Sequence, residues 1–421
     1  MKNKPKPTKH HTHVFHQVCK LIPVGLVGRL SEEHGVSRKC RRFSAWSHVV
    51  ALLFSQLTHA VSLNDVCDVL RHRMPKLGAI RGAVAPSRNG FSHANRTRNS
   101  NMMEALFWQV LAGLQSQHPG FGPSRRYAKL PRKIKRLVHA VDSSTIALVA
   151  NCMDWAKHRR RKAAAKLHLR LNLQTFLPGF AVIEEASHHD SRRMGALCAG
   201  VQAGEIVVFD KAYVHFGHLF ELAQRGVFWI TRAKDNMACK VVKRVRNKAE
   251  GILADEEIEL TGVKSGSLYP KRMRRIRALV EVNGEPVEMV FITNNLEWTA
   301  RNVCDLYAAR WAIEVFFKQI KQTLKLSDFL GHSKHAIRWQ IWAALLLYLL
   351  LRFQGWAAQW PHSFTRLFAL VRGLLWERFH LSELRRHYGT ANEPWRMRAQ
   401  PEPEIEAVTS QAPSMLTLGL N

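Results

Sequence analysis

The sequence predicts an α/β protein in which a helical amino-terminal region precedes a core built around a sheet. Three patterns support this prediction. Two short apolar runs, residues 137–141 and 206–209, each stop directly before an aspartate, as expected of buried central strands with polar groups at their carboxyl ends. Apolar residues recur every three or four positions before residue 120 and again after residue 300, which indicates helices. Between these regions, Asn283-Gly284 is a strong signal for a β-hairpin.

The first region, residues 1–125, is predicted to be a basic arm followed by short helices. Apolar residues recur at helical spacing from Ser44 to Leu70, and Ser62 is placed to cap a second helix within this stretch. A third amphipathic helix is expected over residues 101–114, after a basic turn at residues 92–98.

Residues 126–227 are predicted to form the first part of the core. Leucines at every second position from 167 to 173 alternate with polar residues, which is the period of a half-buried strand. Pro178-Gly179 marks a turn, and residues 180–183 return as the partner strand. Together with the two apolar runs, this hairpin gives the order strand, hairpin, strand.

The remaining chain divides into three predicted parts. Residues 228–300 are expected to be a β-rich insertion, with strand candidates on both sides of Asn283-Gly284. Residues 301–355 are expected to complete the core with a helix over 303–325 and an apolar helix over 337–353. Residues 356–421 are predicted to be helical, ending in a disordered Pro/Glu-rich tail.

The charge of the chain points to a polyanionic partner. Its formal net charge is +31, and between Arg71 and Val141 the only acidic residue is Glu104. Basic groups in this number can neutralise phosphates and release counterions. Nucleic acid is favoured over a membrane surface or a polyacidic protein, because the basic residues are spread over folded-looking segments. The short helices of residues 1–125 are then either a DNA-binding domain or a scaffold with a basic surface.

Cysteine usage and hydropathy exclude other classes. The seven cysteines are scattered without a Cys-x-x-Cys pair, which fits a reducing cytosol and argues against a disulfide framework. The longest apolar run, residues 341–351, is well short of the roughly 20 residues that a membrane span needs. We therefore expect a buried helix there and no membrane.

The expected helix over 303–325 carries the most informative set of side chains. Tyr307, Arg310, Glu314 and Lys321 fall within about 60° of one another on a helical wheel, beside a broad apolar face. A polar stripe next to a buried face is typical of the rim of a cleft. One carboxylate flanked by phosphate-binding groups favours chemistry on a nucleic-acid backbone.

Three carboxylates are candidate metal ligands. Asp142 and Asp210 follow the two apolar runs, and Glu314 lies on the helix. Hard oxygen ligands of this kind suit Mg²⁺ or Mn²⁺, and two ions roughly 4 Å apart can activate an attacking hydroxyl and stabilise the leaving oxygen. Each carboxylate alone also has a structural explanation: a cap at Asp142, a pair with Lys211 at Asp210, and a pair with a basic neighbour on the helix at Glu314.

Taken together, these residues resemble the motifs of the DDE transposases of bacterial insertion sequences. The branch called insertion sequence family four carries a Tyr-x2-Arg-x3-Glu-x6-Lys signature, and the stretch from Tyr307 to Lys321 matches it without a change in spacing. Asp142 matches the first aspartate of the family. Asp210, in Phe-Asp-Lys-Ala-Tyr, matches the second, where the family more often has Asp-Arg-Gly-Tyr. Residues 228–232 resemble the family's next strand, which ends in a DNA-contacting arginine, here Arg232.

The resemblance implies a ribonuclease-H-like catalytic core with a β-rich insertion, plus an α-helical amino-terminal DNA-binding domain. It implies that Asp142, Asp210 and Glu314 hold two Mg²⁺ ions, for which Mn²⁺ can substitute. Arg310 and Lys321 are then expected to bind phosphates near the cut, and Tyr307 to contact the phosphate or the sugar.

The resemblance also implies a cut-and-paste reaction on double-stranded DNA. A homodimer is expected to hold two element ends, nick one strand, form and reopen a hairpin, and join the target, in the bacterial cytoplasm at the nucleoid. An aromatic side chain must then stack on a flipped base. Trp229 and Trp298 are candidates, although a core position is the more frequent explanation for a tryptophan.

Two alternatives stay open. A metal-dependent nuclease of the same fold would share every residue of the candidate site. A catalytically silent DNA-binding protein derived from a transposase would explain the charge, but such a relic is expected to have lost at least one of the three carboxylates.

Overall fold

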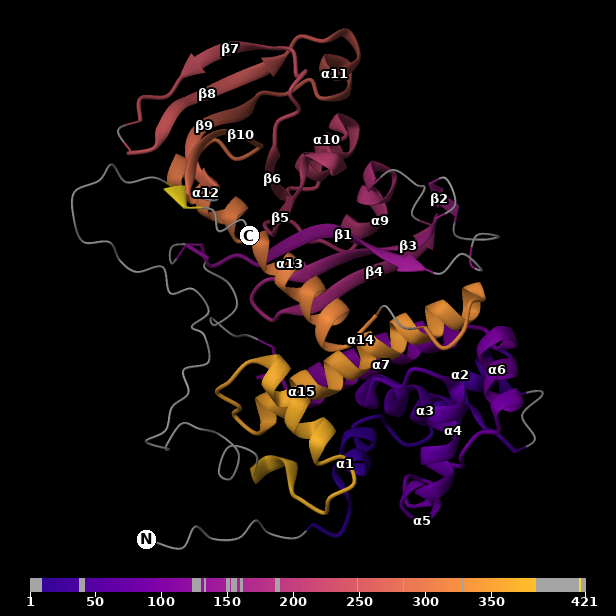
Figure 1. Ribbon diagram of the computed structural model, residues 1–421. Helices are drawn as coiled ribbons and strands as arrows, with labels where there is room; N and C mark the ends of the chain where they lie inside the picture. The colour runs from indigo at the N-terminus through magenta and orange to yellow at the C-terminus, as the bar shows by residue number, and fades with distance from the viewer. Residues whose placement is uncertain are drawn as a thin grey trace, which may run out of the picture. The chain divides into compact units, whose positions relative to one another are not determined.

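The computed structural model describes residues 10–37, 42–122, 130–131, 134–148, 152, 157–159, 162–185, 190–247, 249–282, 284–326, 329–383 and 416–417 (Figure 1). The chain forms two compact units. The helical unit comprises residues 1–121, 146–164 and 318–405, and the sheet unit comprises residues 122–145, 165–317 and 406–421. The expected basic arm up to residue 9 and most of the expected disordered tail lie outside the described residues.

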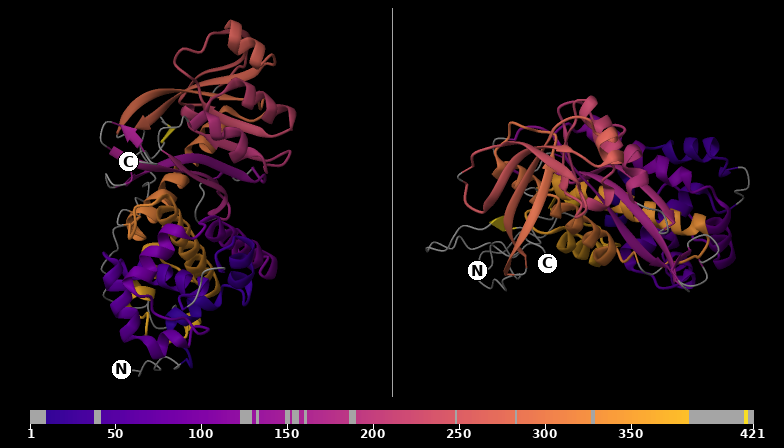
Figure 2. Two further views of the ribbon diagram at one scale, coloured as in Figure 1. Left: turned by 90° about the vertical axis from the view of Figure 1, so that its right-hand side faces the viewer. Right: turned by 90° about the horizontal axis from the view of Figure 1, so that it is seen from above.

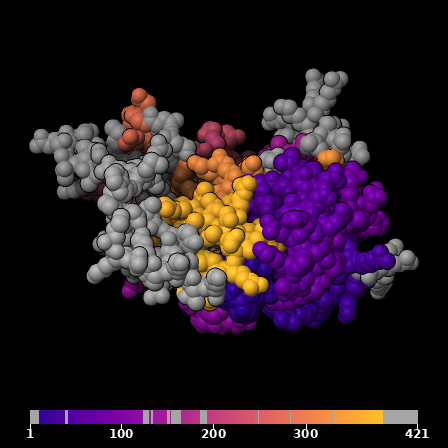
Figure 3. Space-filling model, turned by 60° about the horizontal axis from the view of Figure 1, so that its bottom comes forward, coloured from indigo at the N-terminus to yellow at the C-terminus, as the bar shows by residue number. Residues whose placement is uncertain are grey.

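The helical unit is built around one long buried helix. Its elements are α1 (Val14–Lys20), α2 (Leu26–Glu33), α3 (Ala45–Thr58), α4 (Leu63–His72), α5 (Met74–Gly78), α6 (Arg88–Thr97), α7 (Asn101–Gln117), the π-helix η5 (Gln319–Thr323), α14 (Lys334–Ala357), α15 (Phe364–Gly373) and the 3₁₀-helix η6 (Leu381–Glu383). The helix α14 contacts α3, α6, α7 and α15. Figure 3 shows the carboxyl-terminal helices of this unit, in yellow and orange, beside the indigo and purple amino-terminal helices.

The predicted helices of this unit are confirmed, and local capping explains where they begin. Ser44 caps α3, and Ser62 forms a capping box with Asp65 at the start of α4. By length and composition α14 could cross a membrane, but 89% of its most apolar window is buried inside the protein. It is the buried core helix that the apolar run predicts.

One local prediction was wrong. Residues 92–98, expected to be a turn, belong almost entirely to α6, and a short helix, α5, lies in the segment before it. Ser87 caps α6, and its buried face consists only of Phe91, Ala94 and Asn95. So narrow an apolar stripe gives little periodic signal in a sequence, because tertiary packing rather than propensity stabilises such a helix.

The sheet unit contains most of one extended mixed sheet. The strands of this sheet are β1 (Val138–Leu148), β2 (Lys157–Arg159), β3 (Lys162–Asn172), β4 (Leu177–Glu185), β5 (Ile206–Phe209), β6 (Phe228–Arg232), β7 (Cys239–Arg244), β8 (Ile252–Leu260), β9 (Met273–Val282), β10 (Glu285–Thr293) and β11 (Leu416–Thr417). Of these, β2 lies within residues 146–164 of the helical unit. The helices of the sheet unit are η3 (Asp190–Arg193), α9 (Met194–Cys198), η4 (Lys211–Tyr213), α10 (Phe216–Gln224), α11 (Val263–Leu268), α12 (Ala300–Ala308) and α13 (Trp311–Lys318). The strand order is β2-β3-β1-β5-β6-β10-β9-β8-β7, with β4 paired to β3 and β11 to β9. Figure 1 labels most of these strands, and Figure 2 shows the same ribbon from two further sides.

The predicted mixed α/β fold is confirmed, with two refinements. The strands β1, β5 and β6 are parallel, whereas the neighbours in the order β6-β10-β9-β8-β7 pair antiparallel. Because β6 pairs with both β5 and β10, the boundary expected between residues 227 and 228 falls inside one continuous sheet. The strand β3, expected to be half-buried, is covered on both faces, since His168 and Arg170 are buried as well as the leucines.

An ion-pair network joins the strands beyond β6. Arg274 on β9 makes two hydrogen bonds to the Asp255 carboxylate on β8, of 2.7 and 2.6 Å, and also donates to the carbonyl of Trp298. Both charged side chains are almost completely buried. This pair therefore connects the outer strands to the segment that leads into α12.

We expect Asp255→Ala to destabilise the sheet unit by about 3–5 kcal/mol, because it leaves the Arg274 guanidinium buried without its partner. The matched control is Glu288→Ala, which breaks the half-exposed pair with Arg277 on the same sheet and is expected to cost at most about 1 kcal/mol. Denaturant and thermal unfolding of both variants measure the difference. Equal effects of the two substitutions would contradict the structural role given to Asp255.

Candidate active site

Two of the predicted carboxylates are brought together by the register of the central strands. Val141 of β1 pairs with Phe209 of β5, and Phe209 pairs with Thr231 of β6. The residues that follow these three partners are Asp142, Asp210 and Arg232. Since parallel strands place equivalent positions at the same level, these side chains lie at one edge of the parallel part of the sheet. The strand β1 continues to Leu148, so the apolar run, and not the strand, ends at Asp142.

The third carboxylate comes from a helix that differs from the prediction. The expected continuous helix over 303–325 consists of α12, a turn at residues 309–310, α13 and the π-helix η5. At the turn, the N–H of Arg310 donates to the carbonyl of Tyr307 at 3.0 Å, and the N–H of Ile313 donates to the carbonyl of Arg310 at 3.0 Å. These tight bonds replace the regular α-helical pattern, so a single helical wheel does not describe the whole stretch.

Arg310 joins two of the carboxylates. Its Nη1 donates to Asp142 Oδ2 at 2.7 Å, and its Nη2 donates to Glu314 Oε1 at 2.8 Å. The pair with Glu314 is between helical neighbours and is among the structural explanations that the sequence suggests. The pair with Asp142 spans 168 residues, and no local pattern in the sequence indicates it.

The electrostatics of the site reflect partial burial. Burial raises the pKa of Asp142 to about 6, although the Arg310 charge and the backbone N–H of Ser143 act to lower it. Burial also raises the pKa of Tyr307. For Arg310, burial acts to lower the pKa, but the neighbouring Tyr307, Asp142 and Glu314 outweigh it, and the pKa is raised. Arg310 therefore remains a cation inside the site.

The predicted exposed stripe is only partly exposed. Tyr307 and Arg310 are 5% and 7% accessible, with the Arg310 guanidinium 5.7 Å from the Tyr307 ring and that ring 5.0 Å from Phe291. The Glu314 side chain is 35% exposed. These residues lie inside the site and not at its rim.

Asp210 has its own basic neighbour. Its Oδ1 accepts the N–H of Ala212 at 3.1 Å, which starts η4, and its Oδ2 lies 3.9 Å from Arg232 Nη2. Lys211 instead pairs with Asp235 at 3.2 Å, so a pair with Lys211, the structural alternative for Asp210, is not formed. Ala212 is not among the residues with positive φ, so the backbone does not require glycine at this position.

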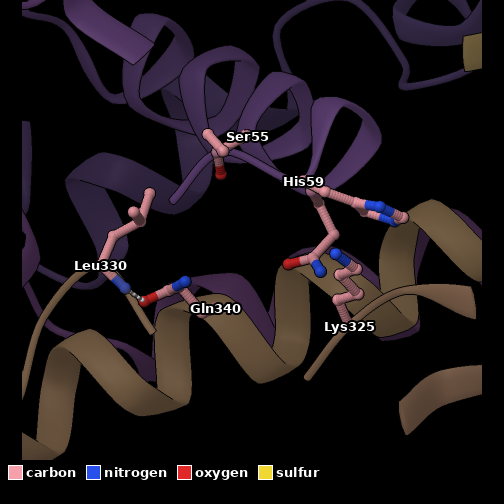
Figure 4. A pocket seen from close by; sticks show the side chains of 7 residues that line it. Ser55, His59, Lys325, Leu330 and Gln340 are labelled. Carbon is pink, nitrogen blue, oxygen red and sulfur yellow. Dashed lines mark hydrogen bonds between the residues drawn. The ribbon is translucent and has the colours of Figure 1, made fainter. Parts of the chain in front are cut away.

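Lys321 belongs to η5 in the helical unit, so its position relative to the carboxylates stays a prediction. Nearby in that unit is a small polar pocket lined by Ser55, His59, Lys325 and Gln340, among others (Figure 4). His59 Nε2 lies 2.9 Å from the carbonyl oxygen of Thr323 at the end of η5. Among the described residues, those that line this pocket include no carboxylate.

Neither tryptophan candidate lies at the carboxylates. Trp229 is completely buried against Tyr269 in the core of the sheet unit. Trp298 packs on Phe228, with ring centroids 5.1 Å apart. Phe228 begins β6 and Arg232 ends it, which separates them by roughly 13 Å along the strand. Trp229 is therefore a core residue, and stacking of Trp298 on a flipped base stays a prediction.

The pKa of Asp142 gives a prediction on stability. Its ordinary pKa is 3.8 and its pKa in the folded protein is about 6, so the folded state binds this proton more tightly than the unfolded state. Ionised Asp142 therefore costs stability at neutral pH, and the cost falls as the pH decreases from about 6 towards 4. We expect the stability of Asp142→Asn relative to the unsubstituted protein to be greater at pH 7.5 than at pH 5, by about 1 kcal/mol.

Denaturant titrations of both proteins at the two pH values measure this double difference, which is the change with pH in the stability of Asp142→Asn relative to the unsubstituted protein. The exposed Glu297, changed to Gln, serves as the control and is expected to show no such dependence. A double difference of zero or of opposite sign would show that Asp142 is not a desolvated carboxylate.

Comparison with known proteins identifies the family. A family model described as the transposase DDE domain matches residues 133–350, and a domain of unknown function matches residues 10–80. A Sinorhizobium fredii protein named as a transposase is 32% identical over 260 residues, which are 61% of this chain and 71% of that protein. A Geobacillus stearothermophilus protein named as a transposase for insertion sequence element IS5377 is 27% identical over 235 residues, 55% of this chain and 59% of that protein.

A solved structure was also found, the cryo-EM structure of a piggyBac transposase synaptic complex with hairpin DNA. It covers 92% of this chain and 85% of its own at 9% identity, with a TM-score of 0.44, which is too low to support an argument. The family model, in contrast, spans more than half of the chain and includes all three carboxylates. The chain belongs to the DDE transposases, as the motifs in its sequence predict.

Proposed function

We propose that this protein is the transposase of an insertion sequence, of family four by its signature, and that it cuts and joins DNA strands at the ends of its element by metal-dependent phosphoryl transfer. The observation that supports this proposal most directly is that Arg310 joins Asp142 to Glu314 within a DDE transposase domain, while Asp210 follows the strand paired with β1. The order β4-β3-β1-β5-β6, with aspartates directly after the paired segments of β1 and β5, supports assigning the core to the ribonuclease-H-like class.

The chemistry of the three carboxylates suits Mg²⁺, for which Mn²⁺ can substitute. Asp142 and Glu314 direct oxygens to one common point, the Arg310 guanidinium, and Asp210 follows the neighbouring strand. Their oxygens are the hard donors that these ions prefer. As arranged, however, no three His, Cys, Asp or Glu side chains among the described residues are close enough together to hold an ion. When bound, two ions activate the attacking oxygen and stabilise the leaving oxygen.

The basic side chains around the carboxylates suit the scissile phosphate. Arg232 is partly exposed beside Asp210, and Arg310 lies between the other two carboxylates. A guanidinium can bind a phosphate through two parallel hydrogen bonds, whereas Lys321 would act as a point charge. The ring of Tyr307 packs beside the Arg310 guanidinium, 5.7 Å away, and helps to position it. Because Tyr307 is only 5% exposed, Arg310 and Arg232 are better placed than Tyr307 to contact DNA directly.

In the helical unit, we propose that the outer face of α6 recognises the element's ends. Arg88, Asn89, Ser92, His93 and Arg96 are all exposed on this helix. None of these five side chains has a hydrogen-bond or ion-pair partner among the described residues. Arginine and asparagine are the side chains that bind guanine and adenine edges in the major groove through two hydrogen bonds.

The inner face of α6 holds the helix in a fixed position. Asn95 Oδ1 lies 2.8 Å from Nε2 of the buried His48 on α3. Burial lowers the pKa of His48 to about 3, so its ring is neutral and donates to the amide oxygen. A helix mounted rigidly, with an unpaired polar outer face, is what direct readout of a groove requires.

The complete reaction that we propose is cut and paste, by a homodimer that holds two ends and passes through a hairpin intermediate. These features come from the resemblance to insertion sequence family four. A related nuclease would cut the same DNA without joining it to a target, and a silent derivative would bind it without cutting.

We expect Glu314→Gln to abolish strand cleavage and leave end binding largely unchanged, because the amide keeps the shape and removes the ligand charge. The loss is expected to be at least as large as the ~10²–10³-fold cost of removing one preorganised electrostatic group. The assay incubates labelled DNA carrying the element's own ends with Mg²⁺ or Ca²⁺ and resolves products on a denaturing gel. Glu297→Gln is the matched control.

The products distinguish the three functions. Nicks at the ends followed by hairpins and strand-transfer products support the transposase. Cleavage without joining would favour the nuclease, and binding without cleavage under either metal would favour the silent derivative. Cutting by Glu314→Gln at the normal rate would show that the triad is wrongly assigned.

We expect Asn89→Ala or Arg88→Ala to reduce the preference for element ends over scrambled DNA by roughly 1–3 kcal/mol each, the value of one specific side-chain contact to a base. Arg71→Ala, an exposed arginine outside α6, is the control and should weaken binding to both DNAs equally or not at all. Competition binding at fixed salt measures the ratio. An unchanged ratio in both α6 variants would rule out α6 as the reading helix.

A further inference from the structure

We propose that Arg310 is a latch that couples metal binding to DNA binding, an inference that rests on the function proposed above. In the protein without DNA, its guanidinium occupies the carboxylate oxygens that a metal ion needs. A DNA phosphate that takes over the guanidinium frees these oxygens. The site then gains its metal ions only once DNA is in place.

Arg310 donates hydrogen bonds to two carboxylates at once. Its two Nη atoms contact oxygens of two different carboxylates, Asp142 at 2.7 Å and Glu314 at 2.8 Å. Only 8% of its side chain is exposed. The guanidinium is therefore the buried cation that neutralises two of the three acidic groups.

A metal ion would compete with Arg310 for the same carboxylate oxygens. Carboxylate oxygens bind Mg²⁺ at about 2.1 Å, so that two ligands of one ion lie about 3 Å apart. The guanidinium takes one oxygen of each carboxylate, Asp142 Oδ2 and Glu314 Oε1, and the other oxygen of Asp142 accepts the N–H of Ser143. Two cations would also repel each other there. Metal binding therefore requires Arg310 to leave at least one carboxylate, which agrees with the absence of a closed three-carboxylate group among the described residues.

An Arg310 guanidinium that leaves a carboxylate needs another anionic partner. A buried cation that loses its partner costs several kcal/mol, so release into an apolar environment is unfavourable. A phosphate is the best replacement, since its oxygens match the planar fork of the guanidinium. Nε of Arg310 is buried and has no hydrogen-bond partner among the described residues, so the two carboxylates do not use all of its donors. The phosphate that this protein meets at the site is the DNA backbone.

Competition for Arg310 and for the carboxylates couples the affinity for metal to the affinity for DNA. If DNA raises the affinity for metal by some factor, metal must raise the affinity for DNA by the same factor. Couplings of this kind commonly amount to roughly 5–150-fold. We expect a factor on the order of tenfold or more, since each ligand removes a competitor of the other. Free protein would then carry little metal, and cutting would be confined to protein already bound to DNA.

The test is direct measurement of Mn²⁺ binding to the full-length protein by electron paramagnetic resonance, with and without a duplex carrying the element's end. For the unsubstituted protein, DNA is expected to raise Mn²⁺ affinity at least about tenfold. For Arg310→Gln, the protein without DNA is expected to bind Mn²⁺ about as tightly as the unsubstituted complex, and DNA is expected to add little.

Three further variants make the test specific. Arg275→Gln removes another arginine–glutamate pair of the same sheet unit, with Glu256, and should behave like the unsubstituted protein. Arg310→Lys keeps the charge but cannot bridge two carboxylates with a planar fork, so metal affinity without DNA should rise and coupling should shrink. It also serves if Arg310→Gln fails to fold, which circular dichroism detects. Asp142→Asn should lose Mn²⁺ binding and so locates the site.

The outcomes separate the latch from the function on which it rests. Mn²⁺ binding that Asp142→Asn removes, but that neither Arg310 variant nor DNA changes, would overturn the latch and leave the metal site intact. Absence of Asp142-dependent Mn²⁺ binding in every protein, with and without DNA, would overturn the proposed metal site and the latch together. Tighter binding by both Arg310 variants with loss of the DNA effect supports the latch.

Discussion

The site depends on one electrostatic constraint: carboxylates held close together in a partly buried place need a cation between or beside them. The parallel register of β1, β5 and β6 sets Asp142 and Asp210 side by side, and α13 adds Glu314. Without compensation, burial and mutual repulsion would drive protons onto these groups, and the raised pKa of Asp142, caused mainly by burial, shows this tendency. Arg310 and Arg232 supply the compensation within the chain.

Much of the site could be predicted from the sequence because its signals are local. An apolar run followed by an aspartate marks where the fully buried part of a strand stops, and the signature around Glu314 has fixed spacings, so the sequence alone proposes all three carboxylates. The pairing of Arg310 with Asp142 could not be predicted, because the two residues are 168 positions apart and only the folded sheet brings them together. The break at residues 309–310 was also missed, since apolar periodicity continues across it.

The misjudged parts of the fold share a physical cause, which is burial of polar groups through tertiary partners. His168 and Arg170 occupy positions that alternation assigns to solvent, but both are buried. The ring of His168 lies 3.0 Å from the Tyr213 hydroxyl, and Arg170 donates to the carbonyl of Leu197. The segment at α6 is similar: Asn95 is buried, and its Oδ1 has a partner in the Nε2 of His48 on α3. Sequence patterning records polarity, whereas burial depends on whether a partner exists elsewhere in the chain.

An arginine that belongs both to a metal site and to a phosphate site gives the signature a physical rationale. A spacing of four residues places Arg310 and Glu314 one turn apart, so the guanidinium reaches the carboxylate on its own helix as well as Asp142 on the sheet. An arginine that bound only phosphate could lie anywhere along the DNA path, and one that served only as a structural partner would not need to face the catalytic edge. The spacing makes sense if the same guanidinium must exchange carboxylate for phosphate when DNA arrives. Such an exchange makes the state of the substrate site control the charge of the metal site.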